Sequence, residues 1–448
     1  FAAAIVTYHS KLTDKQRLQA WLQFREGRAS IMLGTRSAVF TPMHNPGLII
    51  LDEEHDMSFK QQEGFRFSAR DVAIARAKKL NIPVVLGTAT PSLESLLNAN
   101  RGRYHWLHLP IRAGNAVEPT LQLLDIRNKR MQGGLSEALL AAMHKTLQQG
   151  QQVLLFLNRR GYAPVQICHS CGHVARCPGC DANLVIHVAE ERLRCHHCGF
   201  EQRLPKHCPA CRTGELQALG MGTERIEQIL TALFPQYQVV RLDRDSTQRK
   251  GMLEDYLQQI HSGEANIILG TQMLAKGHHF PKVTLVALLD VDSGLFSIDY
   301  RSGERLAQLI VQVSGRAGRA DQPGQVVLQT RHPEHPWLQL LLQGGYRAFA
   351  EQALADRQLA GLPPYGYQAL LRVQAKQPQL AQTFMAAVTQ CLADFGGEQV
   401  SVWGPVSAPM FKRAGQFRYQ LLLQSPRRQD LQRLLADLMP ALQTLQAA

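Results

Sequence analysis

The sequence predicts an α/β protein with two parallel-sheet lobes, a cysteine-rich insertion in the second lobe and a small α+β domain at the end. Short apolar runs alternate with helical patterns in two long stretches, which is typical of parallel sheets with crossover helices. Eight of the nine cysteines fall between Cys168 and Cys211, inside the second stretch. A Gly- and Pro-rich linker at Gly361–Gly366 precedes a separate pattern of strands and helices.

The composition limits the classes of protein to which the chain can belong. The chain has 448 residues, of which 45% are hydrophobic and 19% charged, as in ordinary globular proteins with several domains. Its net charge of +13 favours a polyanionic partner. No apolar run reaches membrane-spanning length, and no cationic segment with an apolar core opens the chain. We therefore expect a cytoplasmic protein with no membrane partner.

Four apolar runs predict the strands of one parallel sheet in the first lobe, with helices over 14–26 and 68–80 as crossovers. The runs are Ala2–Tyr8, Ser30–Leu33, Leu48–Leu51 and Pro83–Leu86. The second run is followed by Gly34-Thr35-Arg36-Ser37 and the fourth by Gly87-Thr88-Ala89-Thr90. Backbone N–H groups and hydroxyls in such turns can hold phosphate oxygens, although each turn alone can be a bare connection.

The third apolar run stops at Asp52-Glu53-Glu54-His55. In a parallel sheet these carboxylates lie at the carboxyl end of the strand, where open α/β sheets bind ligands. We expect Asp52 to hold Mg²⁺ through water, and Glu53 to polarise the water that attacks the γ-phosphate of ATP. For this run taken alone, an apolar strand that ends in solvated charge is the alternative.

The order Gly-Thr-Arg-Ser, Asp-Glu-Glu-His, Gly-Thr-Ala-Thr resembles the first motor lobe of superfamily 2 helicases. The resemblance implies RecA-like lobes, and it implies that His55 couples the nucleotide site to the other lobe. The next segment, 59–67, interleaves aromatic residues with cations and is similar to the aromatic-rich loop that senses DNA in some of these enzymes. The expected DNA contacts are Phe59, Phe65, Arg66 and Phe67. The alternative is that the phenylalanine rings are buried under the sheet.

One motif of these helicases is missing. No G-x-x-x-x-G-K-[ST] occurs in the sequence, so the loop that cradles the β- and γ-phosphates is absent. The family carries this loop ahead of Gly34–Ser37, and the chain begins at Phe1 inside an apolar run. We therefore expect the loop to lie in upstream sequence, and we expect the chain by itself to hydrolyse ATP poorly or not at all.

Four Cys-x-x-Cys pairs form the most specific local pattern in the chain. Four such pairs make two four-cysteine zinc sites, which are structural because no coordination position stays open. The 14 residues between Cys180 and Cys195 are enough for a hairpin of the zinc-ribbon type. We therefore expect one zinc on Cys177, Cys180, Cys195 and Cys198 (the inner site) and the other on Cys168, Cys171, Cys208 and Cys211 (the outer site). One alternative is that the first two Cys-x-x-Cys pairs bind the same zinc ion. The other is that the cysteines form a framework of disulfide bonds.

Five further apolar runs predict the second sheet. They cover 152–157, 238–242, 266–269, 282–289 and 324–330. The string Gln312-Val-Ser-Gly-Arg316-Ala-Gly-Arg319 ends a helical stretch that begins near Gly303. Its arginines can project from one helical face and meet charge on the leaving γ-phosphate. We expect Arg319 to be the arginine finger, Arg316 to assist it and Gln312 to orient water or phosphate. The alternative is an arginine pair that caps the helix C-terminus.

The segment 270–277 (Gly-Thr-Gln-Met-Leu-Ala-Lys-Gly), the arginine string and the eight cysteines complete a resemblance that spans nearly the whole chain. The chain is similar to the bacterial primosomal replication-restart DNA helicases of superfamily 2. The resemblance implies a monomer that uses ATP, Mg²⁺ and two Zn²⁺ and unwinds duplex DNA at stalled forks in the 3′ to 5′ direction. It implies branched and single-stranded DNA, single-stranded-DNA-binding protein and primosome proteins as partners. By position, residues near DNA or the interlobe cleft are Arg36, Thr88, Thr271 and Lys276.

The expected domain organisation follows from these patterns. It is 1–110 for the first lobe, 111–167 for the start of the second lobe, 168–211 for the zinc insertion, 212–331 for the rest of the second lobe and 332–448 for a C-terminal β-α-β-β-α domain. Two functions stay open at this point. One is an ATP-driven DNA helicase with a structural zinc module. The other is a zinc-containing DNA-binding or primosome scaffold protein that does not hydrolyse nucleotide.

Overall fold

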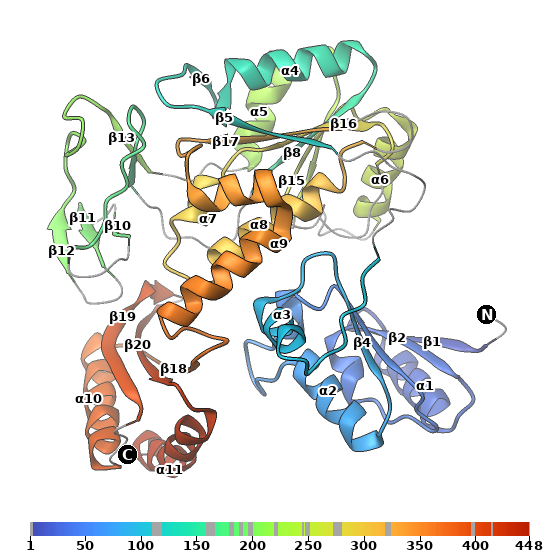
Figure 1. The fold of residues 1–448 in the computed structure, drawn as a ribbon, viewed down its shortest axis with the longest axis vertical. Coiled ribbons are helices and arrows are strands. Elements are labelled where there is room, and N and C mark those ends of the chain that lie inside the picture. The colour runs from blue at the N-terminus through green and yellow to red at the C-terminus, as the bar shows by residue number, and fades with distance from the viewer. Residues whose placement is uncertain are drawn as a thin grey trace. The chain divides into compact units, whose positions relative to one another are not determined.

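The chain divides into two compact units, Phe1–Asn100 and Arg101–Ala448, and each is described by itself (Figure 1). The computed structural model describes residues 3–109, 119–157, 166–178, 183–187, 191–195, 200–218, 223–243, 246, 251–271, 280–318, 324–395, 399–413 and 415–447. Within these segments, no helix combines the length and the apolar character needed to cross a membrane.

The first unit is built from parallel strands and helices. Its elements are β1 (Ile5–Tyr8), α1 (Asp14–Arg25), β2 (Ile31–Gly34), the 3-10 helix η1 (Arg36–Phe40), β3 (Ile49–Asp52), the 3-10 helix η2 (Met57–Phe59), α2 (Ala69–Leu80), β4 (Val84–Gly87) and α3 (Leu93–Asn100). β1 pairs with β2, and β3 pairs with β4, both in parallel. No ladder joins the two pairs in the described part of the chain. The prediction of one continuous sheet was therefore wrong, because strands of one sheet share backbone hydrogen bonds.

Helix α2 shows how local sequence sets an element of this unit. Ser68 caps its N-terminus by accepting the Asp71 N–H, and Asn81 ends it in the left-handed conformation. The buried residues of α2 are alanines four positions apart, Ala69, Ala73 and Ala77. These small side chains let the helix lie close to β3 and β4, which carry the polar turns.

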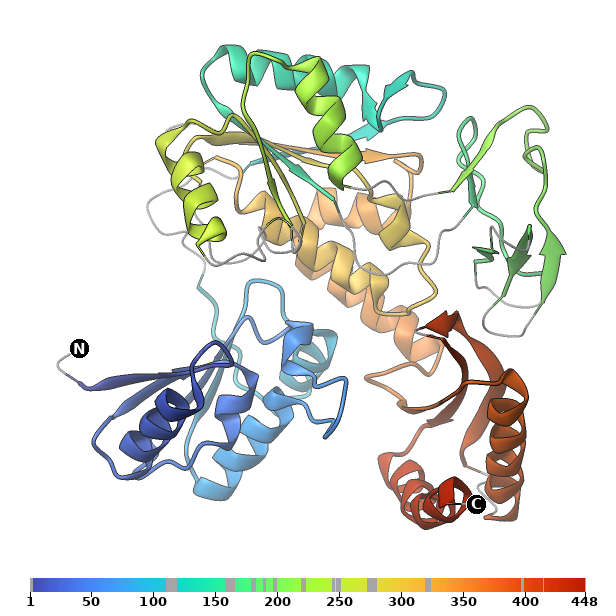
Figure 2. The same cartoon turned by 180° about the vertical axis from the view of Figure 1, so that it is seen from behind.

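A six-stranded parallel sheet forms the centre of the second unit (Figure 2). Its strands, in spatial order, are β14 (Val239–Leu242), β15 (Ile267–Gly270), β8 (Gln152–Phe156), β16 (Val283–Leu288), β17 (Gln325–Thr330) and β5 (Thr120–Asp125). β8 and β15 are buried at every residue, as expected for a parallel sheet covered on both faces. The predicted second sheet is confirmed, and β5 is an additional edge strand.

Helices cover both faces of this sheet. α4 (Glu137–Gln148) and α5 (Thr223–Leu233) pack on one face, where Met143 and Phe234 join a core with Leu155 and Ile267. The other helices of this lobe are α6 (Met252–Ser262), α7 (Asp292–Leu295), α8 (Ser302–Ser314) and α9 (Pro336–Leu359). α8 and α9 lie on the opposite side of the sheet from α4 (Figure 1).

In its described residues, the cysteine-rich insertion carries short strands. They are β9 (Gln166–Cys168), β10 (Val185–His187), β11 (Arg192–Arg194), β12 (Glu201–Arg203) and β13 (Leu216–Ala218); a further hairpin, β6 (Met131–Gln132) with β7 (Leu135–Ser136), precedes α4. β9 pairs with β13 and closes the base of the insertion. β10 and β11 form the hairpin that the spacing of the cysteines predicts.

The C-terminal domain has the predicted β-α-β-β-α order. Its elements are β18 (Tyr367–Ala375), α10 (Pro378–Asp394), β19 (Ser401–Arg413), β20 (Gln416–Ser425) and α11 (Arg428–Ala447). The strands form an antiparallel sheet in the order β18-β20-β19. Met385 of α10 and Leu438 of α11 are buried against Leu421 and Leu423 of β20, and Cys391 packs against this core.

Candidate nucleotide site and metal centre

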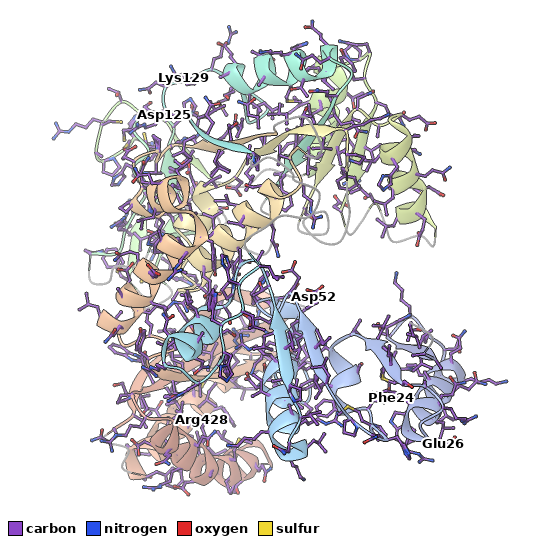
Figure 3. The ribbon with its side chains drawn as sticks, turned by 45° about the vertical axis from the view of Figure 1, so that its right-hand side comes forward. Phe24, Glu26, Asp52, Asp125, Lys129 and Arg428 are labelled. Atoms are coloured by element: carbon purple, nitrogen blue, oxygen red, sulfur yellow. The ribbon has the colours of Figure 1, made fainter. Side chains whose placement is uncertain are left out.

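The four polar residues Asp52-Glu53-Glu54-His55, called the acid turn, form a tight turn at the end of β3. Asp52 is the last residue of the strand (Figure 3), and Oδ1 of its exposed carboxylate accepts the Glu53 N–H at 3.0 Å. Glu53 has a φ of 50°, in the left-handed region that few non-glycine residues adopt. Such backbone strain is concentrated at functional sites. Asp52 offers the exposed carboxylate oxygens that Mg²⁺ takes as ligands.

Glu54, the third acid, was not singled out from the sequence, yet it is the best anchored. Its carboxylate is completely buried and accepts hydrogen bonds from Arg70 Nη1 at 2.9 Å, Ser92 N at 2.7 Å and Ser95 Oγ at 2.9 Å. Burial lowers the pKa of the Arg70 guanidinium, but the charges of Glu54, Glu94 and Asp71 and the hydrogen bond to Glu54 together outweigh this effect, so the net shift of the pKa is upward. Glu54 therefore fixes the acid turn to α2 and to the start of α3.

His55 joins the acid turn to the Gly-Thr turn after β4. Its Nδ1 lies 2.7 Å from Thr88 Oγ1 and 3.5 Å from Glu53 Oε2. Thr88 Oγ1 in turn accepts the Thr90 N–H at 3.0 Å. The His55 side chain is only 5% exposed, so these contacts fix its position. Two of the three polar turns expected at the nucleotide site therefore meet within the first unit.

Arg36, from the turn after β2, holds the backbone of the aromatic loop. Its Nη1 donates to the carbonyl oxygens of Ser58 at 2.9 Å and Lys60 at 3.3 Å. The third polar turn is therefore connected to the segment that follows the acids. A role of Arg36 in DNA contact stays a prediction, and the contacts seen here are with the protein's own main chain.

Aromatic rings cluster at this loop. Phe40 and Phe67 have ring centroids 4.7 Å apart, and Phe65 stacks on Phe67 at 5.9 Å with an angle of 29° between the ring planes. Phe65 is 77% exposed, which excludes the alternative of a buried ring for this residue, whereas Phe59 and Phe67 are partly buried. Arg66 is exposed, and its Nε donates to a carbonyl of the same loop at 3.1 Å. The loop therefore presents one exposed ring on a packed aromatic base.

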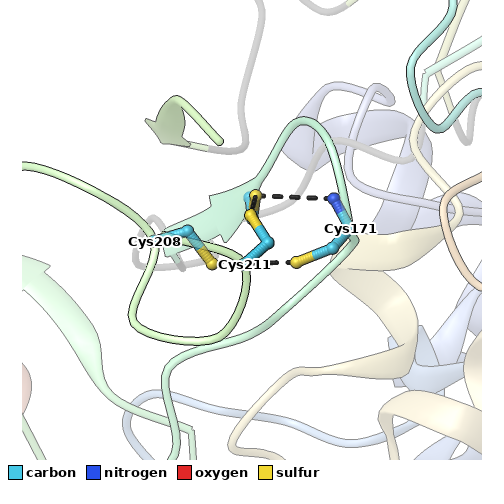
Figure 4. Close-up of side chains that lie close together, drawn as sticks. Cys171, Cys208 and Cys211 are labelled. Carbon is cyan, nitrogen blue, oxygen red and sulfur yellow. Dashed lines mark hydrogen bonds between the residues drawn. The ribbon is translucent and has the colours of Figure 1, made fainter. Parts of the chain in front are cut away.

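The structure brings together the four cysteines expected at the outer zinc site (Figure 4). Their sulfur atoms all lie within 4.8 Å of one another. The Sγ atoms of Cys168 and Cys211 are 3.7 Å apart, as are those of Cys171 and Cys208. A tetrahedral zinc with Zn–S bonds of about 2.3 Å has sulfur–sulfur edges of about 3.8 Å. The four thiols therefore fit one zinc ion.

Gly214 is a residue of this site that the cysteine pattern does not reveal. Its N–H donates to Cys211 Sγ at 3.2 Å, a contact that stabilises a thiolate. A Cβ at this position would lie 2.3 Å from Cys168 Sγ and 2.8 Å from Cys211 Sγ. No other residue fits without displacing the sulfurs. Its position three residues after the last cysteine is the one signal in the sequence that points to it.

A second contact missed from the sequence attaches the outer site to the six-stranded sheet. Arg331, directly after β17, lies with Nη2 3.1 Å from Nδ1 of His169, the neighbour of Cys168. The Arg331 N–H donates to Oδ2 of the buried Asp292 at 3.0 Å. The insertion is therefore tied to the lobe through side chains as well as through its two chain crossings.

Two of the four cysteines expected at the inner site lie in described residues. Cys177 and Cys195 are buried and share a small core with Leu184 and Leu193. Leu193 of this core lies in β11, which pairs with β10 in the hairpin of the zinc-ribbon type. The other two cysteines, Cys180 and Cys198, lie outside the described residues.

The second unit carries the remaining expected site residues. Gln312 lies in the last turn of α8, and Thr271 directly follows β15. Arg316 is two residues beyond the end of α8, so it does not project from a helical face as predicted, and both Gln312 and Arg316 are partly buried. Arg319 and Lys276 lie outside the described residues. The structure therefore fixes Thr271 at the end of β15 and Gln312 in α8, whereas the expected arginine finger, Arg319, is not among the described residues.

Three family models match parts of the chain. The "Helicase conserved C-terminal domain" matches residues 218–321, the "PriA DNA helicase Cys-rich region (CRR) domain" matches 177–203, and the "Primosomal protein N C-terminal domain" matches 358–448. The match to the cysteine-rich region spans all four cysteines of the inner site.

Curated relatives extend the match to almost the whole chain. Replication restart protein PriA of Haemophilus influenzae is 52% identical over 437 residues, which are 98% of this chain and 60% of the relative. The chain belongs to the PriA family. PriA of Bacillus subtilis is 38% identical over 442 residues, 98% of this chain and 55% of the relative. The chain therefore spans only 60% and 55% of the length of these two PriA proteins.

Among solved structures, RecG bound to a three-way DNA junction aligns with 79% of this chain and 36% of that chain. The sequence identity is 13% and the TM-score 0.41, which is too low to carry an argument about fold or function.

Proposed function

We propose that this chain is part of an ATP-dependent DNA helicase that remodels stalled or abandoned replication forks and starts primosome assembly. The observation that carries the proposal is the 52% identity to a replication restart protein over 98% of the chain. Movement in the 3′ to 5′ direction, action as a monomer, and single-stranded-DNA-binding protein and primosome proteins as partners follow from this resemblance. The basic charge of +13 agrees with DNA as the main partner.

For ATP hydrolysis we assign the two front acids of the turn after β3. Asp52 would hold Mg²⁺ through water, and the metal when bound would neutralise phosphate charge. Glu53, beside it on the strained backbone, orients the attacking water, and His55 responds to the nucleotide through its contact with Thr88.

In the second unit the arginine string acts on the same reaction. Arg316 and Arg319 stabilise the charge that develops on the γ-phosphate, and Gln312 orients water or phosphate. The chain contains no G-x-x-x-x-G-K-[ST], so we propose that it hydrolyses ATP poorly when it is alone.

The zinc module is structural. One zinc ion would be held by the outer four cysteines, whose sulfur spacing fits it, and a second by Cys177, Cys180, Cys195 and Cys198. With four thiolates on each ion, no position stays open for a substrate. The ions would add to the small hydrophobic core of a segment whose described strands are three residues long.

DNA is held by stacking and by phosphate contacts. Phe65, as the exposed ring, stacks on an unpaired base, with Phe59 and Phe67 behind it and Arg66 on the backbone. In this proposal Arg36, Thr271 and Lys276 lie along the DNA backbone.

The test of the proposal is Glu53→Gln in a chimera that joins this chain to the part of the Haemophilus influenzae relative that it does not span. Loss of the residue that orients water lowers ATP turnover by about 100-fold or more. Binding of a forked DNA stays as in the parent, because Glu53 makes no DNA contact. Turnover is measured by phosphate release and binding by fluorescence anisotropy.

The control is Glu26→Gln, an exposed acid beyond the end of α1, which leaves both measurements unchanged. Unchanged turnover in Glu53→Gln, or a parent chimera without ATPase, contradicts the proposal. Only the second result supports the alternative of a zinc-containing DNA-binding scaffold that does not hydrolyse nucleotide, whereas the first removes Glu53 from the reaction.

A further inference from the structure

A buried ion pair links α8, the helix that leads into the arginine string, to α9. Arg357 Nη2 lies 2.7 Å from Glu304 Oε2, and the two side chains are 6% and 7% exposed. The ring of Tyr300 lies beneath both Arg301 and Arg357, with guanidinium carbons 4.9 and 5.0 Å from its centroid. A buried ion pair is a poor device for stability alone, since desolvation offsets most of the attraction. The position of this ion pair between α8 and α9 therefore points to a role other than stability.

The shape of α9 makes this contact possible. At Gly345 the backbone leaves the helix with φ 64° and ψ −164°, so two helical segments meet at an angle. The first segment packs on α8 through Trp337, whose ring fills the space next to Gly303. The second begins with Tyr346, whose hydroxyl is 3.3 Å from Gln308 Nε2 of α8. α9 therefore contacts the first two turns of α8 through Trp337, Tyr346 and Arg357.

Contacts continue from Arg357 into the C-terminal domain. Its Nη1 donates to the carbonyl oxygen of Pro363 in the linker at 3.1 Å. Gln424 Nε2 of β20 donates to the carbonyl oxygen of Gly361, in the same linker, at 3.1 Å. A continuous path of hydrogen bonds and packed residues thus runs from Glu304 through Arg357 and the linker to the C-terminal sheet.

We infer that Glu304 and Arg357 are positioning residues that couple helix α8, with its arginine string, to the linker and the C-terminal domain. A movement of α8 during the nucleotide cycle is passed to this domain, and a ligand on the domain acts back on α8 by the same coupling. The inference rests on the proposed function for its catalytic consequence, while the coupling itself is a property of this chain.

The coupling is tested on the chain itself with the double variant Glu304→Met, Arg357→Met. Apolar side chains of similar volume refill a buried ion-pair site with little loss of stability. The bond to Pro363 is lost, so backbone amides of 361–366 exchange with deuterium about tenfold faster or more, and those of α8 also speed up. The measurement is hydrogen–deuterium exchange with mass spectrometry.

The matched control lies on the same helix. Arg347 and Glu351 form an exposed pair at 3.0 Å, and Arg347→Met with Glu351→Met leaves exchange in 361–366 as in the parent. If the first double variant does not fold, Glu304→Gln keeps the side-chain shape and weakens only the charge pairing, and it shows a smaller acceleration. Exchange equal to that of the parent in the variant that folds overturns the inference.

The catalytic consequence is tested in the chimera described above. The double Met variant loses about tenfold or more of the stimulation of ATPase by a single-stranded oligonucleotide, while turnover without DNA stays within about twofold. A purely structural role predicts equal loss of both rates or of neither. A parent chimera with no ATPase contradicts the proposed function alone, since the exchange experiment still decides the coupling. Full DNA stimulation in a variant with faster exchange contradicts the positioning role.

Discussion

Gly214 illustrates how a missing side chain shapes a metal site. The outer cysteines come from both ends of the insertion, and the chain must pass between two of them with no room for a Cβ. The same position supplies an N–H to Cys211. At the scale of the residue, the site thus depends on backbone geometry as much as on its thiols.

Gly214→Ala tests this dependence. The added methyl group displaces Cys168 and Cys211, so the variant purifies with one zinc per chain in place of two. Zinc is counted by inductively coupled plasma mass spectrometry. The control Gly47→Ala, whose Cβ would meet no atom within 4 Å, keeps both ions. Two tightly held ions in Gly214→Ala would contradict both the site geometry and the pairing.

Asp290 is a buried carboxyl group of the second unit whose ionised form is disfavoured. Burial raises its pKa to about 6, and the neighbouring charge of Asp292 adds to the shift. The folded chain therefore binds more protons than the unfolded chain between about pH 4 and 6. Stability falls as the pH rises through this window, and the penalty is complete above it.

Asp290→Asn removes this penalty. We expect the variant to be more stable than the parent by about 2–3 kcal/mol at pH 8, with the gain nearly gone at about pH 3.5, below the pKa of the unfolded carboxyl group. Thermal or urea unfolding followed by circular dichroism at both pH values measures the difference. The exposed Asp14→Asn serves as the control and gives no pH-dependent difference of this sign. A gain that is equal at both pH values rules out the ionisation argument.

At the scale of the element, the aromatic loop is a rigid platform. Arg36 fixes its backbone, and Phe40 supports its rings from another element, the 3-10 helix η1. A pre-positioned ring loses little conformational entropy when a base stacks on it. The loop is therefore suited to hold an unpaired base.

Phe65→Ala weakens binding of a single-stranded oligonucleotide by about 1–3 kcal/mol, the usual contribution of one stacked base. Fluorescence anisotropy at fixed salt gives the affinity, and the unfolding temperature shows that the fold is kept. Phe395→Ala, an aromatic residue 41% exposed at the end of α10, is the comparison with no stacking role. Affinity equal to that of the parent in Phe65→Ala excludes this ring from DNA binding.

At the scale of the whole molecule, two units differ in how completely their sheets are built. The second unit buries a six-stranded sheet on both faces. In the first unit, Ile50 of β3 is 64% exposed and Leu33 of β2 is 57% exposed. Parallel strands are normally covered on both faces, so the described part of the first unit leaves apolar strand surface open.

The sequence by itself determined the α/β class, the second sheet, the zinc-ribbon hairpin and the β-α-β-β-α tail, because periodicity and cysteine spacing are local properties. It also marked Asp52 and Glu53, since acids at a strand end are visible in the residue order. Only the tertiary structure decided the roles of Glu54, Gly214 and the Glu304–Arg357 pair. Each depends on a partner brought near by folding, Ser92 and Ser95 for Glu54 and the distant Cys168 for Gly214. The split of the first unit into two strand pairs was decided in the same way, because ladder hydrogen bonds depend on neighbours in space and not on neighbours along the chain.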